Sequence, residues 1–183
     1  MSAAAEPREA AVELLTIAHA FDYPRPEFRE QIDPGRTQGE REEDYQSAFD
    51  VDGAPLYEGF HRGSEGREGI LEDLIRFYSF FDLRLSETER DYPDHLVTEL
   101  EFLSFLVMRE ADAKAQGEDV RPFQLAQRDF ISRHLAIWLP ALARRLEAAG
   151  CESPLYPGLA SALQELIEAR GRALKQELEG GTS

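Results

Sequence analysis

The stretch from Glu89 to Met108, ERDYPDHLVTELEFLSFLVM, passes from charged and turn-forming residues into apolar residues at helical spacing. Its apolar residues recur at intervals of four, three and four: Leu96, Leu100, Leu103 and Val107. Further large apolar side chains lie on the adjoining face, so the pattern predicts a helix that is apolar over a wide arc. We expect such a helix to be buried on more than one side and to have the other helices packed around it.

The start of this helix is marked by residues that suit a helix N-terminus. Asp91 is a candidate N-cap, and Pro93 suits the first turn because it has no N–H group to leave unpaired. Asp94 adds negative charge where the helix dipole favours it. Tyr92, Asp94 and His95 are therefore expected together at the mouth of the helix.

Helical patterns also cover most of the remaining chain. Helices are predicted over residues 7–21, 40–49, 66–82, 122–134 and 137–149, with Pro140 in the first turn of the last of these, and over a final segment from Pro157. No segment alternates polar and apolar residues as a strand would. The predicted fold class is all-α, a single domain over residues 1–183 built as a bundle of six or seven helices.

Three segments are predicted to be less regular. Residues 22–55 are rich in proline and read as an irregular connection, with a turn near residues 27–31 besides the short helix. Residues 56–65 are aromatic but interrupted by glycines, which predicts a buried loop that crosses the domain. Residues 179–183 are predicted to be a flexible tail.

Length and composition limit the classes of protein. The 183 residues suffice for one sizeable core, and no apolar run approaches the ~18 residues of a membrane span. Glu6, Glu9 and Glu13 stand where a signal peptide would need positive charge and an apolar run, so a cytoplasmic protein is expected. Cys151 is alone, which excludes a disulfide framework.

The charge balance bears on the partner. The chain has 36 acidic and 20 basic residues, a formal net charge of −16. Such a surface repels nucleic-acid phosphates and attracts cationic groups, although solubility alone would also explain it. The sequence therefore predicts no nucleic-acid partner and no insertion into a membrane.

Catalytic motifs are sparse. Gly63, Gly66 and Gly69 are spaced three apart, but no Gly-Lys-Ser/Thr ending follows, so a phosphate loop is not predicted. His95 and Glu99 are four residues apart and could share a metal ion, but no second histidine motif accompanies them. The sequence predicts neither an enzyme, nor a bound metal, nor an intrinsic cofactor.

Three segments taken together resemble a known family. LYEGFHR at residues 56–62 is followed by a helix ending in LIRFYSFFDLRL and then by ERDYPDHLVTELEFLSFL. This combination is similar to the dedicated chaperones of molybdenum oxidoreductases, the all-helical TorD/DmsD/NarJ-type family. Within that family the chain looks most similar to chaperones of dimethylsulfide, ethylbenzene, chlorate and selenate oxidoreductases.

The resemblance implies a function. Members of the family bind the twin-arginine signal peptide of an immature catalytic subunit and hold the apoenzyme in the cytoplasm until its molybdenum cofactor is inserted. The implied partner is therefore the apo catalytic subunit of a molybdenum oxidoreductase and its twin-arginine leader. Transient contact with molybdopterin guanine dinucleotide or a guanine nucleotide stays open, and a monomer is expected, with a dimer as the alternative.

The resemblance also implies a client-binding site. Tyr57 and Phe60 are expected to make apolar contacts, and Glu58 and Asp94 to accept client guanidinium groups. His95 is expected to be a hydrogen-bonding or pH-sensitive member of the site. The full candidate set is Tyr57, Glu58, Phe60, Tyr92, Asp94, His95 and Glu99.

Each assignment has a structural alternative. The two aromatic residues could belong to the core, Asp94 could serve only the helix dipole, and Glu99 could pair with His95. Two other functions also stay open. One is a helical scaffold or regulatory protein that binds a folded partner, and the other is a small metalloenzyme using His95, Glu99 and one of His19, His61 or His134.

Overall fold

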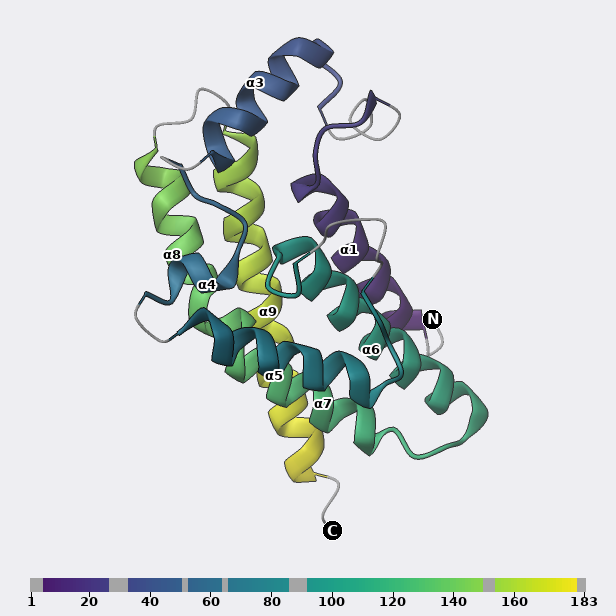
Figure 1. Ribbon diagram of the computed structural model, residues 1–183. Helices are drawn as coiled ribbons and strands as arrows, with labels where there is room; N and C mark the ends of the chain where they lie inside the picture. The colour runs from purple at the N-terminus through teal and green to yellow at the C-terminus, as the bar shows by residue number, and fades with distance from the viewer. Residues whose placement is uncertain are drawn as a thin grey trace.

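The computed structural model describes residues 5–26, 33–50, 53–63, 66–85, 92–149 and 154–180 (Figure 1). Eight helices lie in these ranges: α1 (Ala5–Phe21), α3 (Gln38–Phe49), α4 (Glu58–His61), α5 (Arg67–Phe80), α6 (Leu96–Gln116), α7 (Arg121–Arg133), α8 (Leu135–Ala148) and α9 (Leu155–Gly180). The all-α prediction is confirmed. The helix number exceeds six or seven because α4 forms inside the segment predicted as a loop.

The central helix is α6, as predicted. All four residues of its apolar stripe are at most 1% exposed: Leu96, Leu100, Leu103 and Val107. Helix α1 packs alongside α6 and α7 packs on another side of it (Figure 1). Burial on several faces therefore explains the wide apolar arc.

Small side chains let α1 approach α6 closely. Ala11 and Ala18 are fully buried, and Ser104 on α6 donates a hydrogen bond from Oγ to the Ala11 carbonyl at 2.8 Å. The sequence pattern predicted that other helices pack around α6. It did not identify α1, because small residues carry a weak apolar signal.

Helix α5 joins the core through aromatic rings. Two rings of α5 pack against Phe102 of α6. The ring centroid of Tyr78 lies 4.9 Å from that of Phe102, and the centroid of Phe77 lies 6.3 Å from it. Phe130 on α7 lies 4.8 Å away from Phe102, also edge to face. Such edge-to-face pairs add to the free energy of burial, so Phe102 links three helices.

The start of α6 differs from the prediction. The helix begins at Leu96, and its N-cap is His95, whose Nδ1 accepts a hydrogen bond from the Val97 N–H at 3.3 Å. Pro93 and Asp94 form a turn before the helix, and Asp91 lies outside the described residues. The helix cannot start earlier because the backbone of residues 94–96 pairs with another segment of the chain.

Helices α7 and α8 meet at the single residue His134. Pro140 lies inside α8 and not in its first turn, because α8 begins at Leu135, two residues before the predicted start. Helix α9 begins at Leu155 and continues to Gly180, so it is longer at both ends than expected. Cys151 lies outside the described residues.

The short helix predicted over residues 40–49 is α3. Thr37 and Glu40 form a capping box at its start: the Thr37 side chain accepts from the Glu40 N–H, and the Glu40 carboxylate accepts from the Thr37 N–H. The predicted turn at residues 27–31 lies outside the described residues, and so do residues 181–183 of the predicted tail.

Candidate binding site

Two segments that are far apart in the sequence meet at the start of α6. The Leu96 N–H donates to the Leu56 carbonyl at 2.8 Å, and the Glu58 N–H donates to the Asp94 carbonyl at 2.9 Å. Tyr57 and His95 form an isolated antiparallel bridge between these bonds. The structure therefore brings residues 56–62 and the Pro-Asp-His turn together in one place.

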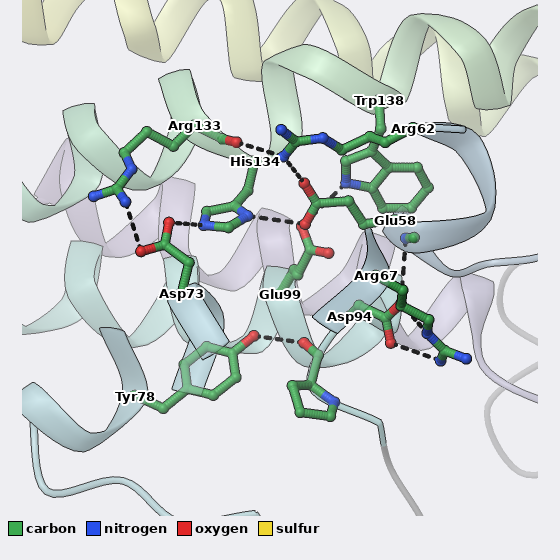
Figure 2. Close-up of polar contacts among 12 residues, drawn as sticks. Glu58, Arg62, Arg67, Asp73, Tyr78, Asp94, Glu99, Arg133, His134 and Trp138 are labelled. Carbon is green, nitrogen blue, oxygen red and sulfur yellow. Dashed lines mark hydrogen bonds and ion pairs between the residues drawn. The ribbon is translucent and has the colours of Figure 1, made fainter. Parts of the chain in front are cut away.

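Asp94 is fully buried and receives three hydrogen bonds. Arg67 at the start of α5 donates from Nε to Oδ2 at 3.1 Å and from Nη2 to Oδ1 at 3.0 Å, and the Gly59 N–H donates to Oδ2 at 3.2 Å. Figure 2 shows the guanidinium facing the carboxylate edge to edge. The Asp94 carboxylate thus pairs with a guanidinium of this chain, and binding of a client guanidinium stays a prediction.

Gly59 is required by this arrangement. A Cβ atom at residue 59 would lie 2.6 Å from Arg67 Cγ and 3.0 Å from Asp94 Oδ2. Because Gly59 has no Cβ atom, the Arg67 side chain can pass close to the α4 backbone and reach Asp94.

Glu58 is the second buried carboxylate of the site. Its Oε1 accepts from Arg62 Nη1 at 2.6 Å, and its Oε2 lies 2.9 Å from His134 Nδ1. Arg62 Nη1 also donates to the Arg133 carbonyl at 3.0 Å. Glu58 therefore ties α4 to the junction of α7 and α8, and its guanidinium partner is again internal.

The network continues from His134 to α5. His134 Nε2 lies 3.2 Å from Asp73 Oδ2, and Arg133 Nη2 donates to Asp73 Oδ1 at 2.5 Å (Figure 2). Both ring nitrogens of His134 thus face carboxylates. The chain from Glu58 through His134 to Asp73 joins α4, α7 and α5.

Glu99 lies below this network and is fully buried. Trp138 Nε1 donates to Glu99 Oε2 at 3.2 Å, while Oε1 is buried with no hydrogen-bond partner. Burial, and next the negative charge of Glu58, raise the pKa of Glu99 well above its ordinary value. A protonated Glu99 is the form that suits this position, where Trp138 donates a hydrogen bond to it.

An aromatic surface lies above Asp94. The Tyr57 ring is 5.8 Å from Tyr92 and 5.0 Å from the His95 ring, both edge to face. Tyr57 and His95 are half-buried, whereas Tyr92 is 52% exposed. Phe60 on α4 is 41% exposed, with the Arg145 guanidinium carbon 4.7 Å from its ring centroid. Phe60 and Tyr92 are therefore surface residues and not core.

The remaining histidines proposed as metal ligands also have protein partners. His61 Nε2 lies 2.7 Å from the Pro55 carbonyl, which can only accept, so Nε2 carries the proton. The His61 ring stacks on Trp138 at 5.3 Å, and burial lowers its pKa. Within the described residues, no group of three or more His, Cys, Asp or Glu side chains is arranged to hold a metal ion.

Sequence reasoning missed the internal partners of the site. Arg62 stands four residues after Glu58, so helical spacing could have indicated that pair. Arg67, Asp73 and His134 are 27 to 76 residues from their partners, and no local pattern predicts such contacts.

A second apolar surface lies between α5 and α7. A groove of about 570 Å³ there is lined by aromatic and aliphatic side chains with paired charges at its rim, and it includes Phe77, Phe80, Phe81, Leu125 and Ala126. Phe80 is 80% exposed.

None of the described helices has both the length and the apolar character that crossing a membrane requires.

Three known proteins that are similar to this chain are named as assembly chaperones of reductases. The selenate reductase assembly chaperone protein of Thauera selenatis is 45% identical over 181 residues, which is 93% of this chain and 92% of that protein. The chlorate reductase assembly chaperone protein of Ideonella dechloratans is 42% identical over 172 residues, 88% of each chain. The perchlorate reductase assembly chaperone protein of Dechloromonas aromatica is 35% identical over 129 residues, 66% of this chain and 58% of that protein.

These relatives are named as assembly chaperones and not as enzymes, in agreement with the prediction from the sequence. The nitrate reductase delta subunit family matches residues 5–144. The chain belongs to that family.

Proposed function

We propose that the protein is a cytoplasmic chaperone dedicated to one molybdenum oxidoreductase. It binds the twin-arginine leader and the apo form of the catalytic subunit, and it releases them for export once the molybdenum cofactor is in place. It needs no cofactor of its own and acts as a monomer.

The observation that carries the proposal is the junction of residues 56–60 with residues 92–95. These segments hold the family motif, and they present two tyrosine rings, a histidine and an exposed phenylalanine around a buried carboxylate. A twin-arginine leader has a cationic end and an apolar stretch, so it needs both chemistries close together. The net charge of −16 favours the approach of such a peptide.

The seven candidate residues divide by exposure. Tyr57, Phe60, Tyr92 and His95 are the residues that contact the leader. Asp94 is buried next to His95, beneath the Arg67 guanidinium that Tyr57 and Tyr92 flank, and it attracts the arginine end of the leader. Glu58 and Glu99 are deeper and hold the surface in shape through Arg62, His134 and Trp138.

Calorimetry with a synthetic leader tests the proposal. The twin-arginine leader of the cognate molybdenum oxidoreductase should bind, and a peptide with Lys-Lys in place of Arg-Arg should bind more weakly, because lysine cannot make two parallel hydrogen bonds to a carboxylate. No heat with either peptide, together with no co-purification of the precursor, would contradict the proposal.

Two exposed aromatic residues locate the apolar contact. Tyr92→Ser should weaken leader binding, whereas Phe80→Ser in the α5–α7 groove is the matched control and should not. Both side chains are exposed, so neither change should disturb the core. If Phe80→Ser weakened leader binding and Tyr92→Ser did not, the leader would bind in the α5–α7 groove.

A scaffold that binds a folded partner is the alternative. The α5–α7 groove favours it, because Phe80 and its neighbours form an apolar surface away from the junction of residues 56–60 with residues 92–95. A complex with the catalytic subunit that survives removal of the leader and is lost with Phe80→Ser would support this alternative.

A further inference from the structure

Arg67 is unusual among the arginines of the site. It makes two parallel hydrogen bonds to the fully buried Asp94 carboxylate, yet its own side chain is 47% exposed. Arg62, by contrast, is 17% exposed and donates both to Glu58 and to a backbone carbonyl of α7. The Arg67 guanidinium is therefore in direct contact with solvent on one side and with a buried anion on the other.

Aromatic rings complete the surroundings of this guanidinium. The Arg67 Cζ atom lies 5.6 Å from the Tyr57 ring centroid and 5.1 Å from the Tyr92 centroid. Both distances are within the range of cation–π attraction. A carboxylate that accepts two parallel bonds between two rings is selective for a planar guanidinium over a lysine ammonium.

The carboxylate does not depend on Arg67 for its position. Asp94 Oδ2 also accepts from the Gly59 N–H, and the Asp94 carbonyl accepts from the Glu58 N–H. These bonds come from α4 and the backbone bridge, whereas Arg67 comes from α5. The site would therefore keep its acceptor if the Arg67 side chain swung out into solvent.

Exchange of one guanidinium for another is energetically feasible here. Removing Arg67 alone would leave a buried carboxylate without its charge partner, which is costly. If another guanidinium takes the same place, the hydrogen bonds and ring contacts are restored, and the displaced Arg67 is hydrated. The incoming group then needs only a modest advantage from contacts elsewhere.

We infer that Asp94, Tyr57 and Tyr92 form a guanidinium site that Arg67 occupies in the free protein, and that an arginine of the client leader replaces Arg67 on binding. This inference rests on the proposed function and adds an internal competitor to it. Arg67 keeps the buried carboxylate paired while no client is bound, and it lowers the affinity for the leader.

The site can be tested without a leader. Arg67→Ala should lower the thermal midpoint, and ethylguanidinium chloride should restore it more than ethylammonium chloride does at the same concentration. The parent and Arg172→Ala should show no such difference; Arg172 is an exposed α9 residue paired with Glu168, so it controls for the loss of one positive charge. Arg67→Ala combined with Asp94→Asn should lose the rescue. Equal effects of the two salts on Arg67→Ala would overturn the inference.

Leader binding gives the second readout. Arg67→Ala should bind the leader about fivefold or more tightly than Arg172→Ala does. The Lys-Lys peptide should gain little. Affinity equal to or weaker than that of Arg172→Ala would overturn the inference. If Arg67→Ala does not fold, Arg67→Gln retains a hydrogen-bond donor for Asp94 and serves in both experiments.

The two levels of the proposal fail differently. Absence of leader binding by the parent and by all variants would count against the proposed function, while rescue by ethylguanidinium would still support the guanidinium site. If the parent binds the leader and Arg67→Ala binds it with the same affinity, the proposed function stands. The role of Arg67 as an internal competitor is then ruled out.

Discussion

At the scale of single residues, Gly59 determines how closely α4 can approach the Arg67–Asp94 pair. The space that its missing Cβ leaves is filled by the Arg67 stem and by an Asp94 oxygen. Gly69, on the exposed side of α5, has no heavy atom within 4 Å of the same position. The two glycines therefore have different structural roles although both lie in helices.

Substituting each glycine with alanine should separate these roles. Gly59→Ala should lower the free energy of unfolding by about 1–3 kcal/mol, because overpacking forces Arg67 or Asp94 to shift. Gly69→Ala should raise it by about 0.5–1 kcal/mol, because alanine loses less backbone entropy in a helix. Urea denaturation measures both. A Gly59→Ala protein as stable as Gly69→Ala would show that Arg67 does not need the space.

Glu99 should make stability depend on pH. Because its pKa is raised in the folded state, the folded protein retains this proton while the unfolded chain loses it. Its stabilising contribution is complete below the ordinary carboxyl pKa and is lost as pH rises toward the raised folded value. Glu99→Gln cannot lose a proton, so its stability relative to the parent should increase over that window.

Thermal melts across the same pH range measure this difference. Glu13→Gln on α1, where the side chain is exposed, is the control for replacing a carboxylate by an amide. Comparison with the parent also cancels the opposite trend of His61, whose lowered pKa reduces stability in acid. If the difference in stability between Glu99→Gln and the parent did not change with pH, Glu99 would be ionised in the folded protein.

At the scale of elements, α6 connects the core to the candidate site. Its N-cap residue His95 lies in the aromatic surface, its first turn carries Glu99, and the apolar stripe runs along the helix from Leu96. His95 caps the helix through a ring nitrogen lone pair, so protonation of that nitrogen would remove the cap. Changes at the start of α6 therefore affect both the helix and the surface.

Truncation within the stripe tests the central place of α6. Leu103→Ala should lower the free energy of unfolding by roughly 2–5 kcal/mol through lost burial and the cavity left behind. Val12→Ala on α1 removes apolar atoms from a side chain that is 57% exposed, so it should cost far less. Denaturant titration measures both. If Leu103→Ala melted like the parent but lost leader binding, the stripe would be a client groove and not the core.

At the scale of the whole molecule, the net charge of −16 has two opposing effects. Like charges repel one another and weaken the compact state, while the same charges attract a cationic leader. Salt screens both interactions over a Debye length of about 8 Å at physiological ionic strength.

Added salt should therefore change stability and binding in opposite directions. As sodium chloride rises to about 0.3 M, the thermal midpoint should increase and the affinity for the leader should fall, because repulsion and attraction are both screened. Melting curves and calorimetry on the same samples provide the comparison. A leader affinity that does not change with salt would mean that the arginine end contributes little.

The sequence alone determined the all-α class, the central helix and the resemblance of three segments to the assembly chaperones, because helix periodicity and short motifs are local. It also placed Tyr57, Tyr92, Asp94 and His95 in one candidate site. Only the tertiary structure decided what the carboxylates bind. Asp94 pairs with Arg67, and Glu58 pairs with His134. The start of α6, its neighbour α1 and the burial of Glu99 likewise depend on segments that meet only after folding, so no local pattern could predict them.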